Sequence, residues 1–346
     1  MKKISIILTV AGLLLFHSCN KEELVTINEP LELDENSRRY QEYLAERAIN
    51  FIQLYRFDKL GDLMDRIIDP QIKAKVEAIY KEYRTRAEND AWYFVTPAND
   101  TLYFLPSVAK DAVQARINFE PSFWDLQNQR NIINAEGVLH GFKNNPKIQS
   151  FSMLNSLATG LKGLEGMPDM TLFDWDIQTH VMIERYPDRE LSPVKLQADF
   201  SKNSKLEVIQ LQFVDITEMI FPSHKLAQWF SVSNGVINSN LNNVSADKIG
   251  AGGVSTDSEI TLTNSVRDFR LSLSGLKKLN LKDLKDLELI SLGLPDCEEL
   301  TLPDGITNEI LTNSRSIASW SAPIRVKSGC IIHNAPDGIE EHVTYY

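Results

Sequence analysis

The chain has 346 residues and a formal net charge of −11 at pH 7. An acidic surface of this kind excludes nucleic acid as an expected partner, because nucleic-acid binding needs clustered Lys and Arg side chains. The length exceeds what one compact core usually holds, so we expect more than one structural region.

The first residues have the pattern of a secretory signal. Two lysines precede an apolar run at residues 4–16, and small or polar residues follow up to Cys19. The run is shorter than the roughly 20 apolar residues that a membrane-spanning helix needs. We therefore expect residues 1–18 to be a removable signal peptide.

The segment around Cys19 resembles a lipoprotein processing site. The stretch LLLFHSC is similar to the lipobox of bacterial lipoproteins, and the following Asn20-Lys21-Glu22-Glu23 resembles the export signal of Bacteroidetes-type surface lipoproteins. This resemblance implies that Cys19 carries acyl chains, that the lipid bilayer is a partner, and that the protein faces the exterior of the outer membrane. Residues 19–33 then form an acidic tether. A charged tether without an address signal is the alternative.

A helical pattern begins after Asp34 or Ser37, either of which can cap a helix. Pro70 marks the start of a second helical segment. In both segments, apolar residues recur three or four positions apart and therefore share one face of a helix. These residues are Leu44, Ala48, Ile52 and Tyr55 in the first segment, and Ile72, Val76, Ile79 and Tyr83 in the second.

The stretch AWYFVTPANDTLYFLPS predicts a β-hairpin. Two aromatic-rich runs, Trp92–Val95 and residues 102–105, flank a strong turn signal at residues 97–100. We expect most of these aromatic side chains in the core, while any exposed ring is available to a ligand. With the two helices, the hairpin defines residues 34–147 as an α+β N-terminal cap region.

Residues 276–305, LKKLNLKDLKDLELISLGLPDCEELTLPDG, show the clearest internal repeat. An apolar-x-apolar triplet recurs about every 20 residues, and Asn or Asp usually stands two positions beyond it. These side chains can satisfy backbone groups where a short strand turns. The triplets begin at Phe151, Met170, Ile209, Phe230, Ile260, Leu279, Leu300 and Trp320.

Residues 297–306, CEELTLPDGI, resemble the repeat of leucine-rich-repeat proteins on Bacteroidetes and spirochaete surfaces. The resemblance covers about residues 148–326 and implies a leucine-rich-repeat-like β-solenoid of short strands. The expected fold class is therefore α+β: a helical and hairpin N-terminal cap, the solenoid, and residues 327–346 as a C-terminal tail or cap. A compact α+β domain with a leucine-rich helix is the alternative.

Few residues suggest catalysis. Asp174-Trp175-Asp176 sets two carboxylates beside an aromatic ring, a combination found in glycosidase clefts, but a structural role at a strand end is favoured. The glycine-rich residues 250–253 lack the lysine of a phosphate-binding loop and predict a flexible loop. We assign no catalytic residue, no metal site and no cofactor.

Three tryptophans and two cysteines complete the candidate residues. Trp175, Trp229 and Trp320 lie close to expected strands and can contact a ligand, although large aromatic side chains more often fill an interior. Cys297 and Cys330 can form a disulfide in an exported protein, and two buried free thiols are the default.

The sequence thus predicts a surface-anchored lipoprotein that works as a non-catalytic recognition or adhesion module. Its ligand is a protein or a polysaccharide, since extended strand surfaces suit large partners. The alternative is a hydrolase that acts on glycans, or an accessory protein of a polysaccharide-uptake system. In the hydrolase, Asp174 and Asp176 are the carboxylates to test.

Overall fold

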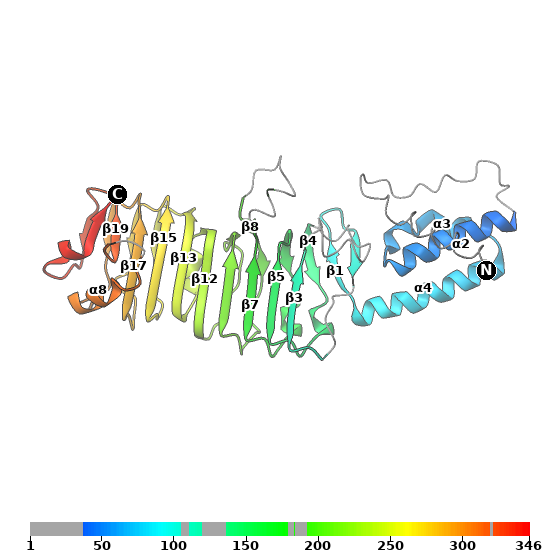
Figure 1. Ribbon diagram of the computed structural model, residues 1–346, viewed down its shortest axis with the longest axis horizontal. Helices are drawn as coiled ribbons and strands as arrows, with labels where there is room; N and C mark the ends of the chain where they lie inside the picture. Colours follow the sequence, from blue (N-terminus) through cyan, green and yellow to red (C-terminus); the bar gives the residue numbers. More distant parts are fainter. Residues whose placement is uncertain (1–36, 105–110, 120–135, 179–182, 184–191, 319–320) are drawn as a thin grey trace, which may run out of the picture.

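The computed structural model describes residues 37–104, 111–119, 136–178, 183, 192–318 and 321–346. The molecule is elongated, with a group of helices at one end and β-strands arranged side by side along the long axis (Figure 1). The short helices among and after the strands are η3 Phe142–Asn144, η4 Leu164–Gly166, η5 Ser239–Asn243, α8 Asn308–Ser314 and η6 Ile339–His342.

The two predicted helices are confirmed, except that Tyr55, expected on the first apolar face, lies beyond the end of α2 and has a positive φ of 56°. The first begins after Ser37, whose hydroxyl accepts a hydrogen bond from the Tyr40 backbone N–H at 3.2 Å. The second begins at Pro70, and the Asp69 side chain caps it by accepting from two backbone N–H groups. Leu44, Ala48 and Ile52 are fully buried against the second helix and its neighbours. The elements of this region are α2 Arg38–Gln53, η1 Phe57–Lys59, α3 Gly61–Arg66 and α4 Pro70–Asp90.

The predicted hairpin is confirmed as well. Strands β1 (Trp92–Val95) and β2 (Thr101–Phe104) pair antiparallel, with Trp92 opposite Phe104. Together with β4 (Gly137–His140), β6 (Ala158–Leu161) and β9 (Gln197–Ala198), they form a five-stranded sheet in the order β2-β1-β4-β6-β9. β4 pairs antiparallel with β1 and parallel with β6, so the hairpin joins a sheet whose other strands are parallel.

A second sheet has 12 strands and runs along most of the molecule. Its main order is β21-β19-β17-β15-β13-β12-β10-β7-β5-β3, with β11 paired to β12 and β8 paired to β11. The bounds are β3 Gln114–Asn118, β5 Ser150–Leu154, β7 Leu172–Asp176, β8 Val194–Lys195, β10 Val208–Gln212, β11 Val214–Asp215, β12 Leu226–Ile237, β13 Ala246–Ser255, β15 Asp268–Ser274, β17 Leu289–Leu294, β19 Ile324–Val326 and β21 Val343–Tyr345.

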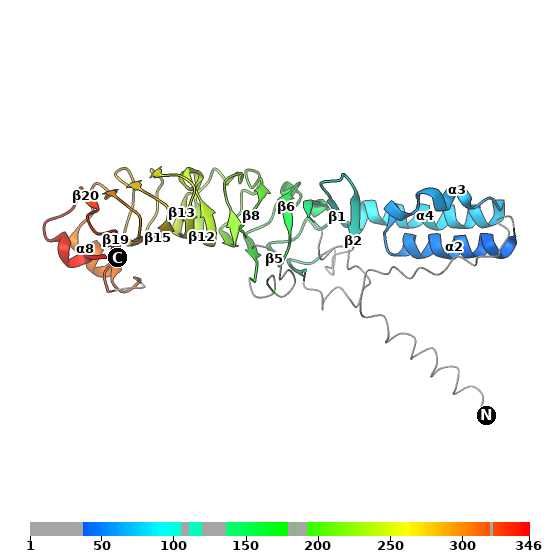
Figure 2. The same ribbon diagram turned by 90° about the horizontal axis from the view of Figure 1, so that it is seen from above.

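A third sheet of four short strands, in the order β14-β16-β18-β20, covers the C-terminal half. Its strands are β14 Glu259–Thr261, β16 Lys278–Asn280, β18 Glu299–Thr301 and β20 Ile331–His333. In Figure 2, β6 and β20 lie on one side of the molecule, and β5 and β15 of the long sheet lie on the other. A continuous apolar core that contains residues of all three sheets fills the space between them.

The expected fold class is wrong. The α+β class with a leucine-rich-repeat-like solenoid gives way to a parallel-sheet α/β type, in which large parallel sheets dominate and helices are few. All pairings of the described strands in the 12-stranded and four-stranded sheets are parallel. An α+β fold would separate its helices from an antiparallel sheet. The regular spacing of the apolar triplets indicated short strands, but it did not predict how those strands assemble into sheets.

The apolar triplets also do not form one series. Phe151, Ile209 and Phe230 lie in the 12-stranded sheet, whereas Ile260, Leu279 and Leu300 lie in the four-stranded sheet. Leu279 pairs with Leu300, and Leu300 pairs in turn with Ile332 of β20. Trp320, expected at that place, lies outside the described residues. The regular spacing of the triplets therefore placed strands of two different sheets in one series.

Residues 250–253 are part of β13 and not a flexible loop. A Cβ atom on Gly253, whose φ is 147°, would lie 2.0 Å from the Gly235 carbonyl oxygen of β12. The register between β12 and β13 shifts between Val232 and Gly235. The glycines thus permit close contact of two backbones at an irregularity, a recognised reason for glycine inside a strand.

Candidate functional site

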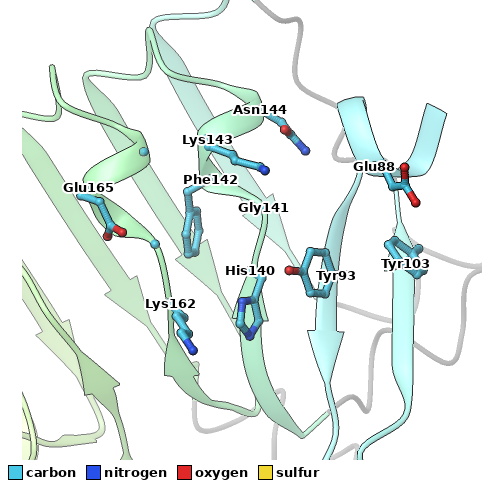
Figure 3. A pocket seen from close by; sticks show the side chains of 12 residues that line it. Glu88, Tyr93, Tyr103, His140, Gly141, Phe142, Lys143, Asn144, Lys162 and Glu165 are labelled. Carbon is cyan, nitrogen blue, oxygen red and sulfur yellow. The ribbon is translucent and has the colours of Figure 1, made fainter. Parts of the chain in front are cut away.

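A row of side chains crosses the outward face of the five-stranded sheet. Tyr103 of β2 is opposite Tyr93 of β1, and Tyr93 is opposite His140 of β4. Lys162 follows β6 directly, and its backbone N–H donates to the Leu139 carbonyl of β4 at 2.9 Å. Figure 3 shows these four side chains on successive strands. We call them the aromatic row: Tyr103, Tyr93, His140 and Lys162.

The row faces outward because its neighbours along each strand take the inward positions. Trp92, Phe94 and Phe104 are fully buried in the core, and Leu139 is buried beside them. Successive side chains of a strand point to opposite faces, so Tyr93, Tyr103 and His140 must lie on the other side. They are only half-buried. The aromatic residues of the hairpin therefore divide between the two faces: some fill the core, and others form part of the exposed surface.

The rings of the aromatic row contact one another closely. Tyr93 and His140 stack with centroids 4.8 Å apart and planes within 7° of parallel, and Tyr93 and Tyr103 have centroids 5.3 Å apart. The Arg84 guanidinium of α4 lies 5.1 Å from the Tyr103 ring centroid and pairs with Glu88 at 3.2 Å. These contacts hold the rings in one arrangement before any ligand is present.

A hollow of about 520 Å³ lies over the row and is bordered by η3 and η4. Lys143 and Asn144 come from η3, and Glu165 comes from η4 (Figure 3). The Asn144 amide donates to the Ala91 carbonyl at 2.8 Å, and this bond ties η3 to the start of β1. The border of the hollow is thus fixed to the sheet.

The chemistry of this site is polar at its edges and apolar along its wall. Burial and the nearby Lys162 ammonium lower the pKa of His140, so its ring is neutral near pH 7. Burial raises the pKa of Tyr103 against the opposing effect of Arg84, so the phenol stays protonated. The site offers hydroxyl, imidazole and ammonium groups around stacked rings.

A second hollow of about 500 Å³ continues across the same sheet. Lys162 lines both hollows, and Gln197 of β9 and Glu218 lie beyond it in the second. Glu218 accepts a hydrogen bond from the Gln197 amide and pairs with Lys195 at 2.6 Å. The two hollows together offer an extended surface rather than a single deep pocket.

The carboxylates predicted from the sequence lie elsewhere, on β7 of the 12-stranded sheet. Asp174 and Asp176 share its outward face, while Trp175 is only 1% exposed and belongs to the core. Burial raises the pKa of Asp174 and Asp176 adds to this effect, against a hydrogen bond from Ser152 of β5. Trp175 therefore cannot contact a ligand in this structure.

Trp229 is not the core residue that the sequence favoured. Its side chain is 37% exposed on the outward face of β12, because the next residue, Phe230, takes the buried position. Val208 of β10 and Leu172 of β7 lie beside it in the same row. Trp229 and the two carboxylates thus share one face. Trp320 and Cys19 lie outside the described residues.

Cys297 and Cys330 are both free thiols, and the fold brings them together. β18 and β20, which follow and adjoin them, pair in parallel with Glu299 opposite Ile331. The interaction between the two thiols lowers the pKa of Cys297 and raises that of Cys330. Whether the two join as a disulfide stays a prediction.

The chain matches no protein-family model, no curated protein and no solved structure. Within the described residues, no group of three or more His, Cys, Asp and Glu side chains is placed to hold a metal ion. No helix in the described part is long and apolar enough to cross a bilayer.

The sequence did not single out the aromatic row as a site. Its signal was the aromatic-rich hairpin, which supplied Tyr93 and Tyr103, but His140 and Lys162 stand about 40 or more positions away along the chain. Only the pairing of β1 with β4, and of β4 with β6, brings the four side chains together. Long-range pairing of this kind leaves no local pattern.

Proposed function

We propose that this chain is an exported, lipid-anchored recognition protein that binds a glycan at the aromatic row without processing it. The observation that carries the proposal is the aromatic row itself. The side chains of Tyr103, Tyr93 and His140 contact one another and line the hollow. Ligand sites in proteins are commonly concave, lined by aromatic side chains, and equipped with a few polar groups.

The lining suits a sugar better than a purely apolar ligand. A sugar ring has C–H faces that pack on aromatic side chains and hydroxyl groups at its edge. The Tyr93 and Tyr103 hydroxyls, the His140 imidazole and the Asn144 amide lie around the hollow and can exchange hydrogen bonds with those groups. The second hollow beyond Lys162 leaves room for a chain of sugars.

Tyr93→Ala should weaken glycan binding by about tenfold or more, because it removes the central ring of the row. A glycan array with the full chain in detergent would identify a ligand, and calorimetry would measure its affinity. Tyr93→Phe, which keeps the ring, should retain most of the binding. Tyr345→Ala is the matched control, since Tyr345 is an exposed tyrosine of β21. Equal affinity of Tyr93→Ala and the unaltered chain would remove the row from the proposal.

The hydrolase alternative has one supporting observation. Asp174 has a raised pKa and shares a face with Asp176, as a general acid beside a second carboxylate would. Release of shorter glycans by the unaltered chain, and its loss in Asp174→Asn, would support hydrolysis over recognition. Retention of glycan without product favours the recognition module.

The lipid anchor is part of the same proposal and rests on the sequence around Cys19. Cys19→Ala should leave the protein without acyl chains and release it from membranes, since the thiol is the attachment atom. Detergent partition of cell extracts measures this directly. Recovery of the variant in the detergent phase would contradict the anchor but leave the glycan site unaffected.

A further inference from the structure

The hollow over the aromatic row is bordered by two ammonium groups, Lys143 and Lys162. Both side chains are exposed. Within the part of the chain that the structure describes, neither has an ion-pair partner. Of the two carboxylates that line the hollow, Glu88 is already paired with Arg84 at 3.2 Å, which leaves Glu165 alone against two positive charges. The hollow is therefore locally positive.

This local charge is opposite in sign to that of the whole protein. The chain carries a formal net charge of −11. Several other exposed lysines have carboxylates beside them: Lys147 lies 2.6 Å from Asp111, and Lys195 of β8 lies 2.6 Å from Glu218. Two uncompensated ammonium groups in an acidic protein, at the border of the hollow with the stacked rings, indicate a negatively charged ligand.

We propose that the ligand of the aromatic row is an anionic glycan, whose carboxylate or sulfate groups contact Lys143 and Lys162. This inference rests on the proposed function, because it specifies the charge of the glycan that the row binds. The rings hold the sugar, while the ammonium groups select the charged residue of the chain through charge-assisted hydrogen bonds. The ammonium groups are solvent-exposed, so their contribution should fall as salt rises.

The decisive comparison uses oligogalacturonate and its methyl ester, which share a backbone and differ in charge. At low salt, calorimetry with the full chain in detergent should show the acid bound about tenfold more tightly than the ester. The double variant Lys143→Gln, Lys162→Gln should bind both ligands with similar affinity. Lys282→Gln, which removes an exposed lysine away from the hollow, should keep the preference. A sulfated galacto-oligosaccharide in a parallel titration distinguishes sulfate from carboxylate.

Three results would overturn this inference, and they can be told apart. In the first, the acid, the ester and the sulfated oligosaccharide bind with equal affinity, and Tyr93→Ala weakens the binding of all three. This result rejects the charge preference and leaves the glycan site in place. Binding of an oligoglutamate peptide as tightly as the charged glycans assigns the lysines to an acidic peptide. Failure of every charged and neutral glycan to bind rejects both the inference and the proposed function.

Discussion

Gly253→Ala should lower the free energy of unfolding by about 3 kcal/mol. The new Cβ would lie 2.0 Å from the Gly235 carbonyl oxygen and 2.7 Å from the Gly235 nitrogen, and neither backbone atom can rotate away as a flexible side chain could. Forced overpacking costs about 1–3 kcal/mol, and a φ of 147° adds strain for any residue with a side chain. The damage falls on the contact between β12 and β13, in the middle of the long sheet.

Gly305→Ala separates the two contributions. Gly305 also has a positive φ, 92°, but its added Cβ would meet no atom within 4 Å. We expect a loss of about 1 kcal/mol there, from backbone strain alone. Urea denaturation of both variants, followed by circular dichroism, provides the measurement. A Gly253→Ala chain as stable as Gly305→Ala would show that β12 and β13 are not in the close contact described above.

Oxidation of the Cys297 and Cys330 pair should raise the free energy of unfolding by about 3–4 kcal/mol, because a disulfide would close a loop of intermediate length. Oxidised glutathione is a suitable oxidant: the protein loses one hydrogen atom from each thiol, and the glutathione disulfide gains both. β18 and β20, which lie beside the two cysteines, already pair in parallel, so little backbone movement is needed. The new bond would also hold β20 at the edge of the four-stranded sheet.

Mass spectrometry of a Cys19→Ala chain would detect the loss of two hydrogen atoms and identify the linked peptides. Cys330→Ser is the control, since it leaves the buried Cys297 in place and should show no gain in stability on oxidation. Two thiols that remain open to alkylation after prolonged exposure to oxidised glutathione would refute the pairing. They would instead support two free cysteines, the default interpretation of the sequence.

Local features of the chain could be predicted because their causes are local. The hydroxyl of Ser37 caps α2 from three residues away, and Pro70 begins α4 because its missing N–H needs no partner there. The turn between β1 and β2 follows from residues 97–100, where Asn99 has a positive φ of 65°. In each case, neighbouring residues contain all of the necessary information.

The candidate site could not be predicted in the same way. The sequence indicated aromatic residues in the hairpin but could not show which ones face outward, because that depends on which side of the sheet meets the core. Trp229 demonstrates the difficulty: its neighbour Phe230 occupies the buried position, and an apolar run alone does not show which of the two points inward. Exposure is thus a property of packing.

The sequence by itself determined the two helices with the start at Pro70, the hairpin, and the recurrence of short apolar segments about every 20 residues. Only the tertiary structure decided that these segments build large parallel sheets of α/β type, and that Phe151 and Leu279 belong to different ones. Tertiary pairing likewise brought Tyr93, His140 and Lys162 into one row. The physical reason is range: capping and turn chemistry act over a few residues, whereas parallel strand pairing joins residues that the chain keeps far apart.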